Sequence, residues 1–370
     1  MMSTIASNSP LIRTRFRISG FGSAYPSGTL TNRELADQFG VTPFWIESRC
    51  GIQSRVVVAP GETTHSLGVA AAKQALATQS AQQPDCLICA TFTPEYRLCP
   101  TAPAIARSLG LGPIAAFDVN AACSGGAVGL LTALSLLAAG TFERILLVAS
   151  DTTTRHLAAE DVHTRILFGD GAAALLLEND VRRGIALRSW VTGSDGTGAT
   201  MFHVPDGEST VSMQGRELFR FATERGCEVL REACLLAQLS VADVDCVLVH
   251  QANLRIVKRL QERTGIAPEK WHVNIGKIGN TAAASVLLTL ASFLQGRTPA
   301  DGTRILLGAF GAGLTWCAAV LEWGVPVTAD ASPPVIPGWD MSWRPSFLQA
   351  ESVLGHRTPD HHTPDSVEVT

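Results

Sequence analysis

Short apolar runs alternate with helical stretches along most of the chain. The runs DCLICAT (85–91), AAFDV (115–119), ERILLVAS (143–150) and AAALLLE (172–178) have the length and composition of buried strands. Between the second and third runs, the uncharged stretch from about Cys123 to Ala139 has the pattern of a buried helix. This alternation predicts an α/β protein with helices on both faces of its sheets.

The second half of the chain repeats the pattern of the first. DCVLVHQ at 245–251 matches DCLICAT, and TRILLGAFG at 303–311 matches the run at 143–150, both at an offset of 160 residues (246 − 86 and 304 − 144). The same offset places Asn120 on Asn280, and each Asn precedes an uncharged helix rich in Ala and Leu. We therefore predict two pseudo-symmetric α/β halves with these two helices buried at the centre.

Composition narrows the classes of protein. The 370 residues are 46% hydrophobic and carry a net charge of −4, so the chain can bury a large core and offers no electrostatic reason to bind nucleic acid or a membrane. Nine scattered cysteines do not form a disulfide framework, and the first residues lack the pattern of a secretory signal, which predicts a cytoplasmic protein. The uncharged stretch 119–142 contains Asn120 and a Gly pair, which favours a core helix over a membrane span.

The composition changes after Trp323. The segment 324–370 holds seven of the 19 prolines and ends in a polar run, so we expect a tail that wraps the surface or is disordered. Three of its residues are histidines, but no Cys or carboxylate completes a metal-binding spacing with them, and we expect no metal site; they are His356, His361 and His362.

Cys123 is the first candidate for chemistry. It lies where a strand meets the central helix, and a helix N-terminus favours a thiolate and lowers its pKa. Ser124 and the Gly pair after it let a substrate approach the backbone. The alternative is that Cys123 is a small buried residue like the other eight cysteines. Cys86 and Cys89 point to opposite faces of one strand, so they are not a redox pair.

Three further features stand near strand ends. His250 follows the strand at 245–249, Asn280 lies in KIGNTAAAS, and GAFGAGLTW (308–316) forms a Gly-rich turn. Each has a structural alternative, namely a satisfied histidine, a helix cap and a tight backbone reversal. The internal symmetry nevertheless brings them to one crevice, where a thiol, two hydrogen-bond donors and exposed backbone N–H groups suit thioester chemistry.

Several motifs together resemble β-ketoacyl-acyl-carrier-protein synthase III, a family with the thiolase fold. They are AACSGG (121–126), HQANLRI (250–256), GNTAAAS (279–285), FGDGAA (168–173), FGAGLTW (310–316) and FWIESRCGIQSR (44–55). The resemblance runs from about Phe16 to Trp323. It implies a homodimer with a five-layered α-β-α-β-α fold, in which residues 1–182 form the half with the nucleophilic Cys, 183–324 the half with His and Asn, and 325–370 the tail.

The resemblance also implies a two-stage reaction. An acyl-CoA would acylate Cys123, and a malonyl thioester on an acyl carrier protein would then lose carbon dioxide and attack the acyl group, with no permanently bound cofactor. His250 and Asn280 would stabilise the enolate, the backbone N–H groups of Cys123 and Ala312 would form the oxyanion hole, and Phe310 would shield the site. Such reactions belong to fatty acid and polyketide biosynthesis.

The chain departs from the family in its substrate-binding positions. Trp45 matches the residue that stacks on the CoA adenine, but the clamping Arg position falls on Val162, with Arg165 three residues on. Three basic residues match positions that meet phosphopantetheine or the carrier protein, although each could be a plain surface charge; they are Arg49, Arg255 and Lys258.

The acyl-pocket loop at 91–110 departs as well. In the family this loop crosses the dimer interface, and an aromatic residue on it closes the partner's acyl pocket. The resemblance would place Thr93 in that pocket and Cys99 at the aromatic position, and the loop is about one residue shorter. The smaller side chain predicts a roomier pocket and a primer bulkier than acetyl.

Two other functions remain open. An enzyme of the same fold could transfer the acyl group to a hydroxyl or amine without decarboxylation, which the altered clamp, pocket loop and tail favour and the intact Asn280 opposes. A non-catalytic partner subunit would be expected to lose Cys123, His250 or Asn280, and none is lost.

Overall fold

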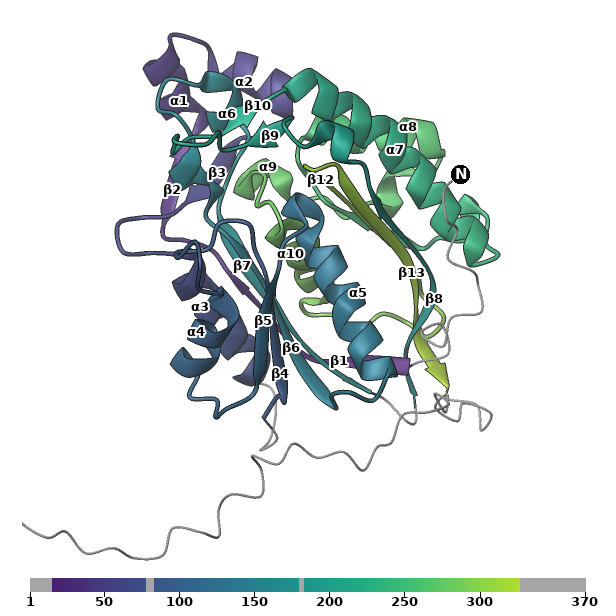
Figure 1. The fold of residues 1–370 in the computed structure, drawn as a ribbon. Coiled ribbons are helices and arrows are strands. Elements are labelled where there is room, and N and C mark those ends of the chain that lie inside the picture. Colours follow the sequence, from purple (N-terminus) through teal and green to yellow (C-terminus); the bar gives the residue numbers. More distant parts are fainter. Residues whose placement is uncertain (1–14, 78–82, 180–182, 327–370) are drawn as a thin grey trace, which may run out of the picture. The chain divides into compact units, whose positions relative to one another are not determined.

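The computed structural model describes residues 15–77, 83–179 and 183–326 (Figure 1). They belong to one structural unit. The boundary that we expected between the two halves, at 182/183, falls beside the undescribed residues 180–182. Strand β13 (Thr315–Pro326) takes in the first two residues of the expected tail, and the rest of the tail, with its three histidines, lies outside the described residues.

Five neighbouring strands form the sheet of the first half. Strands β5, β4 and β6 are parallel to one another, β7 is antiparallel to β6, and β1 is antiparallel to β7. Every residue of β4 and β6 is buried, as the apolar runs CLICA of β4 and ILLVA within β6 predict. In spatial order the strands are β5 (Ala115–Val119), β4 (Cys86–Ala90), β6 (Arg144–Asp151), β7 (Gly171–Asn179) and β1 (Arg15–Ala24).

The second half repeats this arrangement. Strands β11 (Cys246–Val249) and β12 (Arg304–Gly311) are parallel, and β13 is antiparallel both to β12 and to β8 (Arg183–Ser194). Strand β8 pairs with the start of β1, which joins the halves into one nine-stranded sheet. The β5 position differs, because the residues 160 places later form helix α9 (Ile275–Ile278) and leave β11 as the edge.

The helices complete five layers, which confirms the predicted architecture. Helices α5 (Gly125–Ala138) and α10 (Ala284–Leu294) lie between the two groups of strands, as predicted for the two uncharged segments (Figure 1). Helices α3 (Thr64–Ala77) and α4 (Thr101–Ser108) cover the outer face of the first group, and α7 (Gly215–Leu236) and α8 (Leu254–Thr264) are the outer helices of the second half. No helix in the described ranges is long and apolar enough to cross a membrane.

Small elements lie around the carboxyl ends of the strands. They are β2 (Gly28–Thr31), α1 (Asn32–Phe39), α2 (Pro43–Cys50), β3 (Ser54–Val57), α6 (Val162–Arg165), β9 (Phe202–His203) and β10 (Ser212–Met213). Strand β2 pairs with β3, and β9 pairs with β10. Helix α2 begins at Pro43 after Thr42, whose hydroxyl accepts a hydrogen bond from the Trp45 N–H at 3.0 Å, a standard N-terminal cap.

Matching turns before the two central helices confirm the internal repeat. Ala122 and Ala282 both adopt left-handed backbone conformations, with φ of 47° and 52°. The Oδ1 atom of Asn120 accepts a hydrogen bond from the Ala122 N–H at 3.1 Å, and Asn280 holds the Ala282 N–H in the same way at 3.0 Å. A left-handed alanine costs roughly 1–2 kcal/mol, so each Asn helps to hold an unfavourable turn.

The central helices approach each other closely near their N-termini. A Cβ atom added to Gly126 of α5 would lie 2.4 Å from the carbonyl oxygen of Ala283, at the start of α10. Backbone meets backbone here, so neither neighbour can move aside by changing a rotamer. The Gly pair noted in the sequence therefore sets the spacing of the central layer.

Replacing Gly126 with Ala should destabilise the protein by about 1–3 kcal/mol, the usual cost of overpacking a core. Urea unfolding followed by circular dichroism would measure the change. Gly112→Ala is the matched control, because a Cβ there meets no atom within 4 Å, and it should change stability by no more than about 0.5 kcal/mol. Equal midpoints for the two variants would contradict the close approach.

Candidate active site

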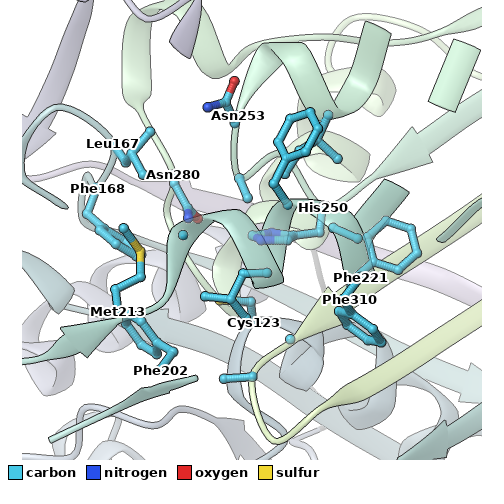
Figure 2. Close-up of a pocket in the computed structure, with 18 residues that line it drawn as sticks. Cys123, Leu167, Phe168, Phe202, Met213, Phe221, His250, Asn253, Asn280 and Phe310 are labelled. Atoms are coloured by element: carbon cyan, nitrogen blue, oxygen red, sulfur yellow. The ribbon is translucent and has the colours of Figure 1, made fainter. Parts of the chain in front are cut away.

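Cys123, His250 and Asn280 line a single pocket with an empty volume of about 770 Å³ (Figure 2). Phe310 and Ala312 line it as well, so the structure brings together five of the residues singled out in the sequence. Most of the remaining wall is apolar and comes from β9, β10, α7 and α8. The pocket is therefore a largely apolar chamber with a few polar groups at its base, the usual form of a small-molecule site.

Cys123 lies in a 3-10 turn, Ala122–Ser124, that leads into α5. The Ser124 hydroxyl donates a hydrogen bond to the Ala121 carbonyl at 2.7 Å and lies 2.9 Å from the Thr315 hydroxyl, which links this turn to β13. Gly311 passes so close that a Cβ there would lie 2.8 Å from the Ser124 nitrogen. The thiol is thus held at the N-terminus of α5, as predicted, with 8% of the residue exposed.

Our expectation of a lowered thiol pKa is wrong. The pKa of Cys123 is raised to about 12. Burial is the larger cause of this increase, and the negative charge of Asp151 is the smaller one. Removing the thiolate from water outweighs the favourable helix N-terminus, because an anion loses more by desolvation than the partial charge of the helix returns. Cys123 is therefore a neutral thiol in the unliganded protein at neutral pH.

His250 directly follows β11, as the sequence predicts. Its backbone N–H donates to the Gly308 carbonyl at 2.8 Å, and the residue is 3% exposed. Burial lowers the pKa of His250 to about 4, so the imidazole is neutral. Its Nδ1 atom is buried and has no hydrogen-bond partner among the described residues. A neutral ring of this kind can both donate a hydrogen bond and accept a proton.

Asn280 is held from both sides. Its backbone N–H donates to Leu167 at 2.8 Å, and its carbonyl accepts from Gly169 at 3.0 Å. A Cβ at Gly169 would lie 2.1 Å from the Ile278 carbonyl, so the FGDG and GNTAAAS motifs fit together only with glycine there. Because Oδ1 accepts the Ala282 N–H, the amide is oriented and Nδ2 is left as the donor.

Phe310 and Ala312 form the wall beside the thiol. Phe310 is 4% exposed and its ring packs against Gly226 of α7. The Ala312 carbonyl accepts a hydrogen bond from the Thr315 hydroxyl at 3.1 Å. Neither the Ala312 N–H nor the Cys123 N–H donates to another described residue. Two backbone donors are thus present in the turns that flank the thiol.

Trp45 and Arg49 lie on α2, outside the pocket lining. The Arg49 guanidinium stacks over the Trp45 ring at 4.8 Å from its centroid. The Arg49 carbonyl accepts a hydrogen bond at 3.2 Å from Asn253, which does line the pocket, so α2 flanks the pocket rim. Val162 packs in the same apolar cluster as Trp45, whereas Arg165 lines a separate pocket between β2 and β3 and the 154–157 turn.

Arg255 and Lys258 are exposed on α8. The Arg255 guanidinium lies 5.7 Å from the ring centroid of Phe219, which lines the pocket. Lys258 follows about one helical turn later, so both charges stand on the same side of the helix. The structure thus places a basic surface beside the pocket.

Thr93 and Cys99 are not in this pocket. Thr93 lines a neighbouring pocket of about 1090 Å³ that shares Phe202 and Ala312 with the first. Cys99 is exposed, on a loop where Leu98 is 100% exposed. The remaining eight cysteines are buried, and all nine are free. We expected the eight cysteines other than Cys123 to be small buried residues, and Cys99 is the exception.

Sequence reasoning missed two parts of the site. Phe202 and Met213 reach the pocket from β9 and β10, but in the sequence they are isolated apolar residues in a polar stretch without a period. Asp151 was missed too, although a carboxylate directly after a buried run was a usable signal. Among the described residues, no group of three or more His, Cys, Asp or Glu side chains could hold a metal ion.

Comparisons with known proteins agree on one family. The models for 3-oxoacyl-[acyl-carrier-protein] synthase III and for its C-terminal part match residues 117–196 and 234–323. The chain is 41% identical over 324 residues to β-ketoacyl-[acyl-carrier-protein] synthase III 3 of Streptomyces coelicolor, covering 83% of this chain and 96% of the relative.

Solved structures give the same result. A 3-oxoacyl-(acyl carrier protein) synthase III from Pseudomonas aeruginosa PAO1 is 34% identical with a TM-score of 0.80, over 85% of this chain and 100% of its own. The priming β-ketosynthase of the R1128 polyketide biosynthetic pathway is 31% identical with a TM-score of 0.77, over 87% and 98%. The predicted fold class is thereby confirmed.

The neutral thiol predicts a steep pH dependence for Cys123. Because the thiolate is the reactive form and its pKa is raised, alkylation of unliganded protein by iodoacetamide should accelerate about tenfold per pH unit between about pH 7 and pH 10. Peptide mapping by mass spectrometry would separate Cys123 from the other cysteines. A plateau reached below about pH 8 would show instead that the helix N-terminus dominates.

Proposed function

Because the chain belongs to the 3-oxoacyl-[acyl-carrier-protein] synthase III family and is a condensing transferase, we propose that its Cys123 pocket joins an acyl group to a malonyl thioester. The observation that carries the proposal is that Cys123, His250 and Asn280 line one buried, mostly apolar pocket. Each of the three supplies a group that the reaction needs. In each side chain, at least one such group is not engaged in a structural hydrogen bond with another described residue.

The first stage acylates Cys123. The sulfur attacks the thioester carbon of an acyl-CoA, a new C–S bond forms, and the bond to CoA breaks. Because the thiol is neutral, its proton passes to His250 as the sulfur attacks and then to the departing CoA sulfur. The backbone N–H groups of Cys123 and Ala312 stabilise the oxyanion of the tetrahedral intermediate.

The second stage forms the carbon–carbon bond. The malonyl carboxylate leaves as carbon dioxide, and the electron pair moves onto the thioester oxygen, where His250 and Asn280 Nδ2 donate hydrogen bonds. The resulting carbanion attacks the acyl carbon on Cys123, the C–S bond breaks, and the thiolate takes a proton from solvent. Phe310 and the apolar walls favour this stage, because a carboxylate is less stable in a dry pocket than the carbon dioxide it releases.

The substrates account for the residues around the pocket mouth. We propose that Trp45 and Arg49 bind the CoA nucleotide and phosphopantetheine, and that Arg255 and Lys258 meet an acidic acyl carrier protein. The position of all four beside the rim supports this assignment. Acyl-CoA and the malonyl thioester act as substrates, and the site uses no permanently bound cofactor.

We also propose that the enzyme is a homodimer. Strand β5 is an edge of the sheet, and its partly exposed residues include Phe117 and Val119. The nearby loop exposes Tyr96 and Leu98 by 66% and 100%. An unprotected sheet edge with exposed apolar side chains nearby is a surface suited to association. A second copy of the chain would both cover the edge of β5 and bury these side chains. In that dimer Thr93 and the partner's copy of the 91–100 loop would bound the acyl pocket.

Two variants test the reaction. Incubation with an acyl-CoA should add the acyl mass to Cys123, as seen by intact-mass analysis, and Cys123→Ala should take up none. Asn280→Asp keeps the oxygen that holds the Ala282 N–H but removes the Nδ2 donor, so it should retain acylation while carbon dioxide release falls about 10²–10³-fold.

The other outcomes decide between the alternatives. An adduct with no carbon dioxide release from malonyl thioester would favour transfer to a hydroxyl or amine acceptor. No adduct from either CoA or carrier-protein donors would favour a non-catalytic partner subunit. Carbon dioxide release that is equal in Asn280→Asp and the unaltered protein would contradict the assigned role of Asn280.

The pocket loop predicts the size of the primer. Medium-chain or branched acyl-CoA should acylate Cys123 faster than acetyl-CoA, and Cys99→Phe should reverse this order by narrowing the partner's pocket. Sedimentation should give twice the 39.2 kDa chain mass for both proteins. Preference for acetyl-CoA in the unaltered protein would contradict the roomier pocket. A monomeric protein would contradict an acyl pocket shared between two chains.

A further inference from the structure

Asp151 is a buried carboxylate that joins three separate segments. It ends β6 and is fully buried. Its Oδ2 atom accepts the Ala283 N–H at 2.9 Å, at the start of α10. Its Oδ1 atom faces the start of the 91–100 loop, where the donors are the Thr91 hydroxyl at 2.9 Å, the Phe92 N–H at 3.0 Å, and the hydroxyl and N–H of Thr93 at 2.8 and 3.2 Å.

The other half of the internal repeat lacks an equivalent of this carboxylate. The offset of 160 relates Cys123 to Ala283 (123 + 160) and Asp151 to Gly311 (151 + 160). At α10 the Asp151 carboxylate satisfies the N–H of Ala283, whereas at α5 the equivalent Gly311 brings no side chain to the Cys123 N–H. One helix N-terminus is therefore closed by an internal anion, and its counterpart is left open beside the thiol.

Few other charges surround this pair. Asp151 acts electrostatically on Cys123 and on Cys89 of β4, which is also influenced by Asp118. His250 is the other titratable residue that lines the Cys123 pocket, and its pKa is lowered. Helices α5 and α10 carry no charged residue. Burial raises the pKa of Asp151 to about 6 against the opposing effect of its hydrogen bonds, so the carboxylate is an anion at neutral pH.

We propose that Asp151 is a positioning residue for the Cys123 site, a role that rests on the proposed function. Its Oδ2 atom fixes the turn that carries Asn280, and its Oδ1 atom fixes Thr93 in the neighbouring pocket. Its charge adds to the effect of burial in holding Cys123 in the neutral thiol form until an acyl donor enters and a proton can pass to His250. The same anion thus orders the site and restrains its nucleophile.

Asp151→Asn tests the charge while keeping the shape of the side chain. Iodoacetamide alkylation of Cys123, followed by peptide mapping at several pH values, should become about tenfold faster or more at any one pH below about 9, the effect of removing a nearby like charge. Asp170→Asn is the matched control. Asp170 is equally buried and accepts hydrogen bonds from the Val58 and Thr154 N–H groups, but it does not act on Cys123, so alkylation should change less than about twofold.

A second variant guards against misfolding. The new amide of Asp151→Asn could direct its NH₂ group at the Ala283 N–H, whereas the shorter side chain of Asp151→Ser removes the charge without an NH₂ group. Circular dichroism would establish which variants fold. Alkylation within about twofold of the unaltered protein in a folded Asp151 variant would overturn the proposal. So would failure of both Asp151 variants to fold while Asp170→Asn folds, because the role would then be structural alone.

This measurement is independent of the proposed reaction. Alkylation uses neither acyl-CoA nor malonyl thioester, so a faster rate in Asp151→Asn would support the inference even if no acyl adduct formed. Conversely, normal acylation and carbon dioxide release in the unaltered protein, together with unchanged alkylation in Asp151→Asn, would overturn the role of Asp151 and leave the proposed function intact.

Discussion

The structure depends on the close packing of two uncharged helices at the centre of the molecule. Gly126 lies against the backbone of Ala283, so α5 and α10 meet near their N-termini without intervening side chains. The turns that carry Cys123 and Asn280 immediately precede these contacts. A small change in helix spacing would therefore move the Cys123 thiol relative to the Asn280 amide, so the geometry of the site depends on this tightly packed part of the core.

Burial determines the chemistry as much as geometry does. The pocket holds a thiol with a raised pKa beside an imidazole with a lowered pKa, so both are neutral before substrate arrives. A neutral thiol reacts slowly with small electrophiles in solution, because the thiolate is the reactive form. In the reaction that we propose, selectivity would come from binding of the acyl donor, because the unliganded protein holds no thiolate at neutral pH.

Much of this could be predicted from the sequence, for reasons that individual residues make clear. Apolar runs and the 160-residue offset gave the strands, the central helices and the equivalence of Asn120 and Asn280, because these depend on periodicity. His250 and Asn280 could be placed because strand ends and symmetry locate them. The thiol pKa could not, since it depends on how completely β12, β13 and α5, which pack against the Cys123 turn, remove the thiol from water. Phe202 and Met213 escaped detection because a two-residue strand has no period. The structure places the site residues, but their roles remain predictions: the catalytic ones of Cys123, His250, Asn280, Phe310 and Ala312, and the binding ones of Trp45, Arg49, Thr93, Cys99, Arg255 and Lys258.

The paired left-handed turns at Ala122 and Ala282 have a consequence for how such a site can arise. A duplicated chain inherits two copies of every local geometry, and the folding of the whole needs only one of them to be fully satisfied. Here the copy at α10 completes its hydrogen bonding through Asp151, while the copy at α5 keeps the Cys123 N–H unengaged. The α10 turn thus has its Ala283 donor satisfied and carries Asn280, whereas the α5 turn keeps a free donor beside the thiol, so two copies of one local geometry supply different parts of a single site.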